Sequence, residues 1–113
     1  MKNQLIFLPV CKTLFREYQN SYDITHKMDK RSIDLIIYKN SYTHHAIHSI
    51  YIYEPGGKLL HYYEQGHNSL KPFLNSISYA ERIIIKRWLK KFSTKKGAYQ
   101  TLNYLHKQVK FYK

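Results

Sequence analysis

The first forty residues contain two short apolar runs, residues 4–10 and residues 32–38. Each run has the length of a strand and is too short for a buried helix, so we predict two strands. Between them, apolar side chains recur at helical spacing over residues 11–21, which predicts a short helix. Residues 22–31 are mostly polar and are expected to form a connection.

Residues 49–53 and 58–63 predict a β-hairpin. Both segments are rich in tyrosine, isoleucine and leucine, which favour paired strands. The residues between them include Pro55, which presets the first corner of a turn, and Gly56 and Gly57, which tolerate a positive φ. This hairpin is the clearest local signal in the first half of the chain.

The second half changes to helical spacing. Ser69 is expected to cap a short helix over residues 70–75, with Pro72 in its first turn, where a missing N–H costs little. Ser78 and Glu81 have the spacing of a capping box, which predicts a second helix that ends at about residue 92. The apolar stripe of this second helix is Ile84, Ile85, Trp88, Leu89 and Phe92.

Gly97 is predicted to break the chain before a last helix over residues 98–111. Leu102, Leu105 and Val109 lie on one face of that helix, together with Tyr112 just beyond it. The pattern therefore predicts one α+β domain over residues 1–113, with a small N-terminal antiparallel sheet packed against two or three C-terminal helices. Its first part, residues 1–66, is expected to be mainly β with one short helix, and residues 67–113 to be helical.

Composition limits the class of protein. Hydrophobic residues make up 43% of the 113, enough for a packed core, and no apolar run approaches the roughly 20 residues that a membrane span needs. The chain has one cysteine, Cys11, which cannot form an internal disulfide. With no secretory signal visible, we expect a reducing, cytoplasmic compartment and no contact with a membrane.

The charge is high and lopsided. The net charge is +12, of which residues 1–57 carry +2 and residues 58–113 carry +10. Residues 82–113 contain ten Lys and Arg and no Asp or Glu. Because like charges repel in a compact state, a block of one sign indicates an anionic partner. The alternative is a solvated helix face with no partner.

We expect that partner to be nucleic acid, DNA in preference to RNA. Cations one helical turn apart can meet successive phosphates while the opposite helix face stays in the core. Asn75 and Gln100 have the chemistry to reach base edges, exposed tyrosines can stack on unpaired bases, and Trp88 is assigned to the core. The predicted phosphate-binding residues are Arg82, Lys86, Arg87, Lys90, Lys91, Lys95, Lys96, Lys107 and Lys110.

Residues 50–91 resemble the modular DNA-binding segments appended to homing endonucleases. The resemblance is carried by Ile50-Tyr51-Ile52-Tyr53, Gly57-Lys58, Asn68-Ser69-Leu70 and the Ile84–Lys91 segment. Those modules run from a short hairpin through a serine-capped helix into a helix-turn-helix. The resemblance implies that residues 84–91 lie on a DNA-facing recognition helix. The small size and composition would also suit a phage, viral or mobile-element accessory protein.

An enzymatic alternative uses Cys11, His48 and His61. Cysteine and histidine in this order are similar to the NlpC/P60 class of papain-like hydrolases, in which a cysteine at a helix N-terminus is activated by a strand histidine. The resemblance implies that His48 and His61 come within reach of each other across the hairpin. The motif residues around Cys11 differ from that class, so we expect a binding protein rather than an enzyme.

We expect no metal or other cofactor. His44, His45 and His48 are close in sequence, but structural zinc sites usually include cysteine pairs and the chain has one cysteine. The seven carboxylates are scattered, and no Gly-rich phosphate loop is present. A third possibility is a protein-binding inhibitor whose basic face docks on an acidic partner. The oligomeric state is left open by the sequence.

Overall fold

The computed structural model describes residues 12–28, 30–39, 47–108 and 111–112. They form a six-stranded sheet in the order β5-β4-β3-β2-β1-β6. Neighbouring strands from β1 to β5 are antiparallel, and β6 pairs in parallel with β1 at the edge. The strands are β1 Lys12–Glu17, β2 Ser21–Lys27, β3 Ser32–Tyr38, β4 Ile47–Tyr53, β5 Leu59–Glu64 and β6 Phe111–Tyr112.

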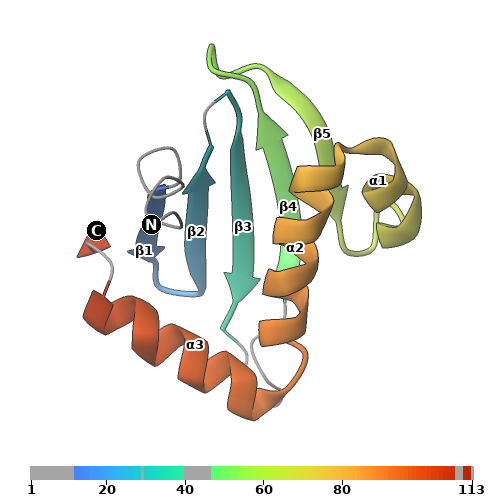
Figure 1. The fold of residues 1–113 in the computed structure, drawn as a ribbon. Coiled ribbons are helices and arrows are strands. Elements are labelled where there is room, and N and C mark those ends of the chain that lie inside the picture. The colour runs from blue at the N-terminus through green and yellow to red at the C-terminus, as the bar shows by residue number, and fades with distance from the viewer. Residues whose placement is uncertain (1–11, 29, 40–46, 109–110, 113) are drawn as a thin grey trace, which may run out of the picture.

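Three helices follow the fifth strand: α1 Leu70–Ser76, α2 Tyr79–Lys91 and α3 Lys95–Gln108. Figure 1 shows α2 crossing one face of the sheet, α3 running across the ends of the strands, and α1 beside β5. The expected α+β class, a small antiparallel sheet followed by three C-terminal helices, is confirmed. The strand predicted over residues 32–38 and the hairpin predicted over residues 49–63 are also confirmed.

The core lies between the helices and one face of the sheet. Phe15, Ile24, Leu35 and Ile50 are in register across β1 to β4, and all four are fully buried. Because side chains alternate across a strand, this row fixes which face of the sheet meets the helices. From the helices, the buried hydrophobic side chains are Phe73, Ile77, Ile85, Phe92, Ala98, Leu102 and Leu105.

The helix predicted over residues 11–21 is wrong. Lys12–Glu17 is strand β1, and its turn closes with a hydrogen bond from the Tyr18 N–H to the Ser21 carbonyl oxygen at 2.8 Å. The chain then returns as β2, so residues 22–31 are largely strand rather than a connection. Phe15 in β1 pairs with Ile24 in β2, and burying both against the helices outweighs the local helical spacing.

The C-terminal boundaries also differ from the prediction. Helix α3 begins at Lys95 rather than at residue 98 and ends at Gln108, and Phe111–Tyr112 forms β6 instead of extending the helix. Ser69 occupies the N-cap position of α1 but its side chain makes no capping hydrogen bond. The strand predicted over residues 4–10 lies outside the described residues, as do Cys11, His44, His45, Val109 and Lys110.

The sheet face opposite the helices carries two neighbouring carboxyl groups, Asp23 and Asp34. Asp23 pairs with Ile36 in β3, and Asp34 lies diagonally beside it, opposite Thr25. Asp23 is buried, and its Oδ1 has no hydrogen-bond partner among the described residues. Burial and the adjacent Asp34 raise the pKa of the Asp23 carboxyl to about 8, although Arg16 opposes the shift.

We expect the Asp23→Asn variant to be more stable than the wild type at pH 8, by about 1–3 kcal/mol. Between pH 3.8 and about 8, folded Asp23 keeps a proton that the unfolded chain has released, so the free energy of unfolding falls as pH rises. Asparagine does not ionise, so the free energy of unfolding of the variant lacks this decline with pH. Urea unfolding of both proteins at several pH values measures the difference. Parallel stability curves over this range would contradict the assignment.

Candidate nucleic-acid interface

The start of α2 is anchored by Glu81. The Ser78 Oγ accepts a hydrogen bond from the Glu81 N–H at 3.2 Å, and the Glu81 carboxylate accepts one from the Ser78 N–H at 3.0 Å, so the predicted capping box is confirmed. The Arg31 guanidinium donates to both carboxylate oxygens, at 3.2 and 3.0 Å. Burial favours the neutral acid, but the bonds from Ser78 and Arg31 outweigh it and lower the pKa of Glu81. These contacts tie α2 to the connection between β2 and β3.

The outward face of α2 is cationic. Ile85 and Phe92 are buried against the sheet, and Trp88 and Leu89 are half-buried beside them. Successive residues of a helix are rotated by about 100° around its axis. The side of α2 opposite to Ile85 and Phe92, from Lys86 to Lys91, therefore covers an arc of about 140°. Four exposed cations lie on that arc, Lys86, Arg87, Lys90 and Lys91, together with Tyr79, Ala80 and Ile83.

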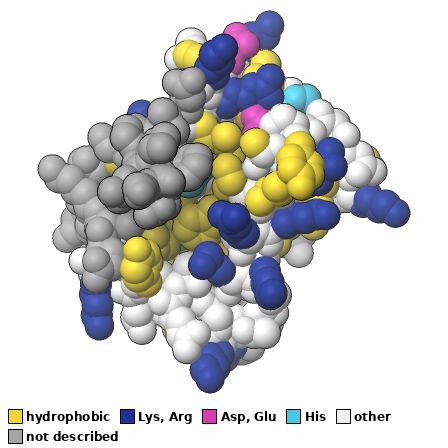
Figure 2. Space-filling model, in the orientation of Figure 1, with side chains coloured by type: hydrophobic (Ala, Val, Ile, Leu, Met, Phe, Trp, Pro, Cys, Tyr) yellow, Lys and Arg dark blue, Asp and Glu magenta, His cyan; other side chains and the backbone are white. Residues whose placement is uncertain are grey.

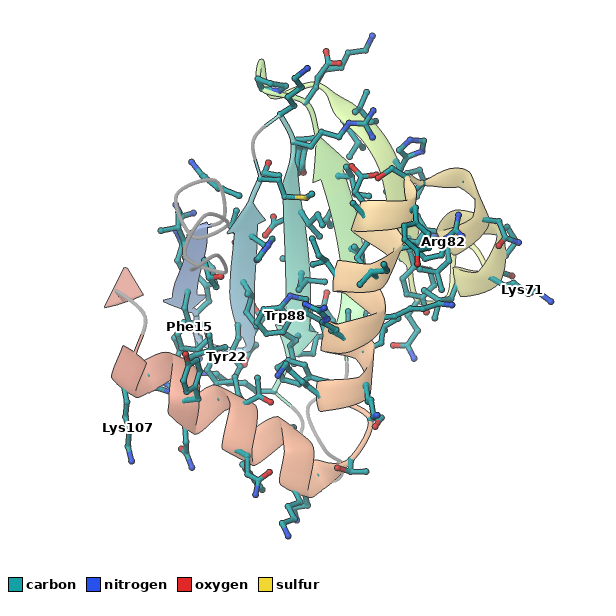
Figure 3. The ribbon with its side chains drawn as sticks, in the orientation of Figure 1. Phe15, Tyr22, Lys71, Arg82, Trp88 and Lys107 are labelled. Atoms are coloured by element: carbon teal, nitrogen blue, oxygen red, sulfur yellow. The ribbon has the colours of Figure 1, made fainter. Side chains whose placement is uncertain are left out.

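Arg82 does not belong to this face, contrary to the prediction. Its Nε donates to the Leu74 carbonyl oxygen at 2.9 Å and its Nη2 to the Ile77 carbonyl oxygen at 3.4 Å. These carbonyls lie at the C-terminal end of α1, where a helix leaves acceptors without partners of its own. Figure 3 shows Arg82 directed from α2 toward α1. The guanidinium therefore joins two helices.

A tight corner connects α2 to α3. Phe92 is the C-cap of α2, and Thr94 caps α3 through its Oγ1, which accepts from the Gly97 N–H at 3.0 Å. A Cβ on Gly97 would lie 2.4 Å from the Lys91 carbonyl oxygen. The sequence predicts that Gly97 breaks the chain before the last helix. Instead, Gly97 lies inside α3, where its missing side chain lets the two helices approach. Lys95 and Lys96 are consequently in the first turn of α3, not in a loop.

The inner side of this corner is a recess of about 540 Å³, which we call the α2–α3 cleft. Trp88, Lys90 and Lys91 line it from α2, and Gln100, Thr101 and Tyr104 line it from α3. Gly97, Leu105 and Thr13 of β1 complete the lining. In Figure 2 hydrophobic side chains surface in the recess in front of the sheet, and Lys and Arg side chains stand along the helices that border it.

Two aromatic side chains of the cleft come from different helices. Trp88 stacks on the buried Phe92, with ring centroids 6.4 Å apart and an interplanar angle of 22°, so its indole is held in place. Figure 3 shows Trp88 on the side of α2 opposite to Arg82. Tyr104 is 61% exposed. The sequence prediction placed Trp88 in the core, where it does pack in part. It gave exposed tyrosines in general a stacking role but singled out neither Tyr104 nor Thr101.

The Lys and Arg side chains of α2 and α3 have no carboxylate partner within the described part of the chain. The ion pairs there are Arg31–Glu81, Lys39–Glu17 and His106–Glu17. The first turn of α3 contains Lys95 and Lys96 and no acidic residue, although a helix N-terminus favours anions. We use the name basic surface for the exposed cations of these helices: Lys86, Arg87, Lys90, Lys91, Lys95, Lys96 and Lys107.

Comparisons of the chain with protein-family models, curated proteins and solved structures found no match. The interpretation of the basic surface and the cleft therefore rests on their own geometry. Lys107 extends the basic surface to the far end of α3, and Figure 3 shows its side chain directed away from the body of the protein. Asn75, predicted to reach bases, lies on α1, beyond α2 from the cleft.

The histidines of the alternative hydrolase site are not brought together. His61 of β5 pairs with Ile52, whereas His48 lies four residues earlier on β4, a separation of roughly 13 Å along the strand. His61 shares a face with buried Ile52, and His48 stacks on Tyr38 at 4.0 Å. Each of these positions suits packing against a neighbouring side chain. Cys11 is outside the described residues.

The described residues contain no group of three or more His, Cys, Asp or Glu side chains that could hold a metal ion. Two of their carboxylates, Glu17 and Glu64, have other contacts. The Glu17 carboxylate accepts hydrogen bonds from Lys39 and His106, and these bonds lower the pKa of Glu17. The Glu64 carboxylate accepts a hydrogen bond from the Tyr51 hydroxyl. In the same part of the chain, no helix has the length and apolar character needed to cross a membrane.

Proposed function

We propose that this protein binds nucleic acid, DNA in preference to RNA, through the basic surface of α2 and α3. The observation that carries the proposal is that seven exposed cations lie on two adjoining helices without a carboxylate partner among the described residues. Such a concentration of one charge raises the electrostatic cost of the compact state. A polyanion that neutralises these side chains would release its condensed counterions and offset that cost.

The spacing of the cations suits a phosphate backbone. Lys86 and Lys90 are one turn apart on α2, a rise of about 6 Å. The corner at Gly97 then brings the first turn of α3, with Lys95 and Lys96, next to the last turn of α2. A backbone that followed α2 would therefore meet further cations at the start of α3. The resemblance of residues 50–91 to appended DNA-binding segments also supports this proposal, because residues 84–91 belong to the cationic helix α2.

Binding of a fluorescent oligonucleotide, followed by anisotropy, tests the proposal. Between about 50 and 200 mM salt we expect the logarithm of the association constant to fall linearly, with a slope near −0.7 to −0.9 per phosphate contacted. Contact with five or six phosphates would lower affinity by roughly two to three orders of magnitude over this range. Binding that is absent at the lowest salt, or that does not depend on salt, would reject the proposal.

The same measurement separates nucleic acid from an acidic protein partner. If the basic surface serves a protein, a pull-down from nuclease-treated lysate would still recover that protein, and purified oligonucleotides would bind weakly at low salt. Binding of purified nucleic acid with the expected salt dependence supports direct recognition. A role as a phage, viral or mobile-element accessory protein stays a prediction.

A further inference from the structure

The α2–α3 cleft has a chemistry that phosphate binding alone does not require. Lys90 and Lys91 provide cations at its border, but Trp88 and Tyr104 give it aromatic surface. A phosphate gains from cations and N–H donors and gains little from an indole or phenol ring. A recess lined by aromatic side chains with a few polar groups at its border is the common form of a site for a ligand with an apolar or planar part.

We infer that the α2–α3 cleft holds an unpaired base of a single-stranded nucleic acid. This inference rests on the proposed function and specifies its substrate class. The base would stack on Trp88 and also contact Tyr104 across the cleft, while its flanking phosphates contact Lys90 and Lys91. Stacking platforms next to cations are the general means by which proteins hold single strands.

The dimensions and position of the cleft agree with this assignment. A recess of about 540 Å³ is in the range of sites that take small organic groups, and it lies between helices, where such sites often occur. The bases of a duplex are stacked on each other and cannot enter a recess without flipping out, which costs a few kcal/mol. A single strand pays less, because its bases are already free of pairing.

The polar groups of the cleft fit a base edge. Gln100 carries both a donor and an acceptor, and the Thr101 hydroxyl can act as either. Both belong to α3, on the same side of the cleft as Tyr104. A base that contacts Tyr104 would therefore have next to its edge two groups of the same helix that can form hydrogen bonds. Stacking accepts every base, so we expect a modest sequence preference at most.

Trp88 is the only tryptophan of the chain, so intrinsic fluorescence reports directly on this cleft. We expect oligothymidylate to quench Trp88 emission at low salt as its base stacks on the indole. An oligomer of abasic sites with the same number of phosphates should bind through the basic surface without quenching. Equal quenching by both oligomers would overturn the inference, and so would strong binding of oligothymidylate with unchanged emission.

The matched variants are Tyr104→Ala and Tyr79→Ala. Both tyrosines are exposed, 61% for Tyr104 and 73% for Tyr79, so neither change should unfold the protein. Tyr104→Ala should weaken oligothymidylate binding about tenfold and leave binding of the abasic oligomer unchanged. Tyr79 begins α2, away from the cleft, and Tyr79→Ala should bind both oligomers like the wild type. If Tyr104→Ala keeps full affinity for oligothymidylate, the inference is wrong.

These experiments separate the inference from the proposed function. Salt-dependent binding of duplex and abasic oligomers, equal to that of oligothymidylate, would leave nucleic-acid binding in place and reject the base site. Absence of binding to every oligomer at low salt would reject both. Tighter binding of oligothymidylate than of a duplex of equal length supports the base site, and the same result with oligouridylate would extend it to RNA.

Discussion

Replacing Lys90 and Lys91 with glutamate is expected to weaken nucleic-acid binding at least about 100-fold at low salt, because like charges placed against phosphates cost several kcal/mol. These lysines belong both to the basic surface and to the α2–α3 cleft, so no other pair on α2 affects both. The salt dependence should also become shallower, by about 1.4 to 1.8 units of slope for two lost contacts. Anisotropy titrations at several salt concentrations measure both effects.

Two controls keep this prediction specific. Lys27→Glu with Lys58→Glu changes the net charge by the same amount at exposed positions near the hairpin turns, at the end of the sheet away from α3. This control should lose much less affinity. Lys90 and Lys91 also favour the C-terminal end of α2 electrostatically, so Lys90→Gln with Lys91→Gln provides a milder variant. Equal losses of affinity in the two double glutamate variants would show that the net charge of the protein sets the affinity and that the position of the basic surface does not.

Those parts of the fold that depend on local chemistry could be predicted from the sequence. The hairpin follows from strand-forming segments around Pro55 and Gly57, and Gly57 has the positive φ, 92°, that such a turn uses. The start of α2 follows from Ser78 and Glu81, whose side chains need only each other's backbone. In both cases the residues that decide the structure are within a few positions of one another.

The first sixteen described residues could not be predicted in this way. Phe15 suits a helix as well as a strand by its spacing, and β2 is mostly polar. The strand conformation of this segment is decided by the pairing of Phe15 with Ile24 and of Ile24 with Leu35, three buried side chains on three strands. Burial of such side chains contributes about 1.5–3 kcal/mol each, more than local helix propensity.

Only part of the candidate site could be predicted from the sequence, because the rest depends on how the helices pack. The cations of α2 were found from helical periodicity, which is a local property, and four of them are exposed on one face. Arg82 shares that periodicity but lies beside the carbonyls of Leu74 and Ile77, and its position depends on how α1 packs. The cleft depends on the angle between α2 and α3. No spacing within one helix carries that information.

The Gly97→Ala variant is expected to lower the free energy of unfolding by about 1–3 kcal/mol. Within an ordinary helix, alanine in place of glycine is stabilising by about 1 kcal/mol, so the predicted sign is reversed. The reason is that the new Cβ would lie 2.4 Å from the Lys91 carbonyl oxygen and 3.4 Å from its carbon, both backbone atoms. The two helices must then move apart, and Lys90, Lys91 and Gln100 would lose their positions around the cleft.

Gly56→Ala is the matched control, because a Cβ there meets nothing within 4 Å and Gly56 is not among the described positive-φ glycines. Its stability should stay within about 0.5 kcal/mol of the wild type. Urea unfolding followed by Trp88 fluorescence measures both variants, and oligonucleotide binding should weaken only for Gly97→Ala. Should Gly97→Ala be as stable as the wild type or more so, the close approach of α2 and α3 at this corner would be incorrect. The geometry of the cleft would then lose its basis, because the same contact sets the positions of its lysines and its aromatic rings.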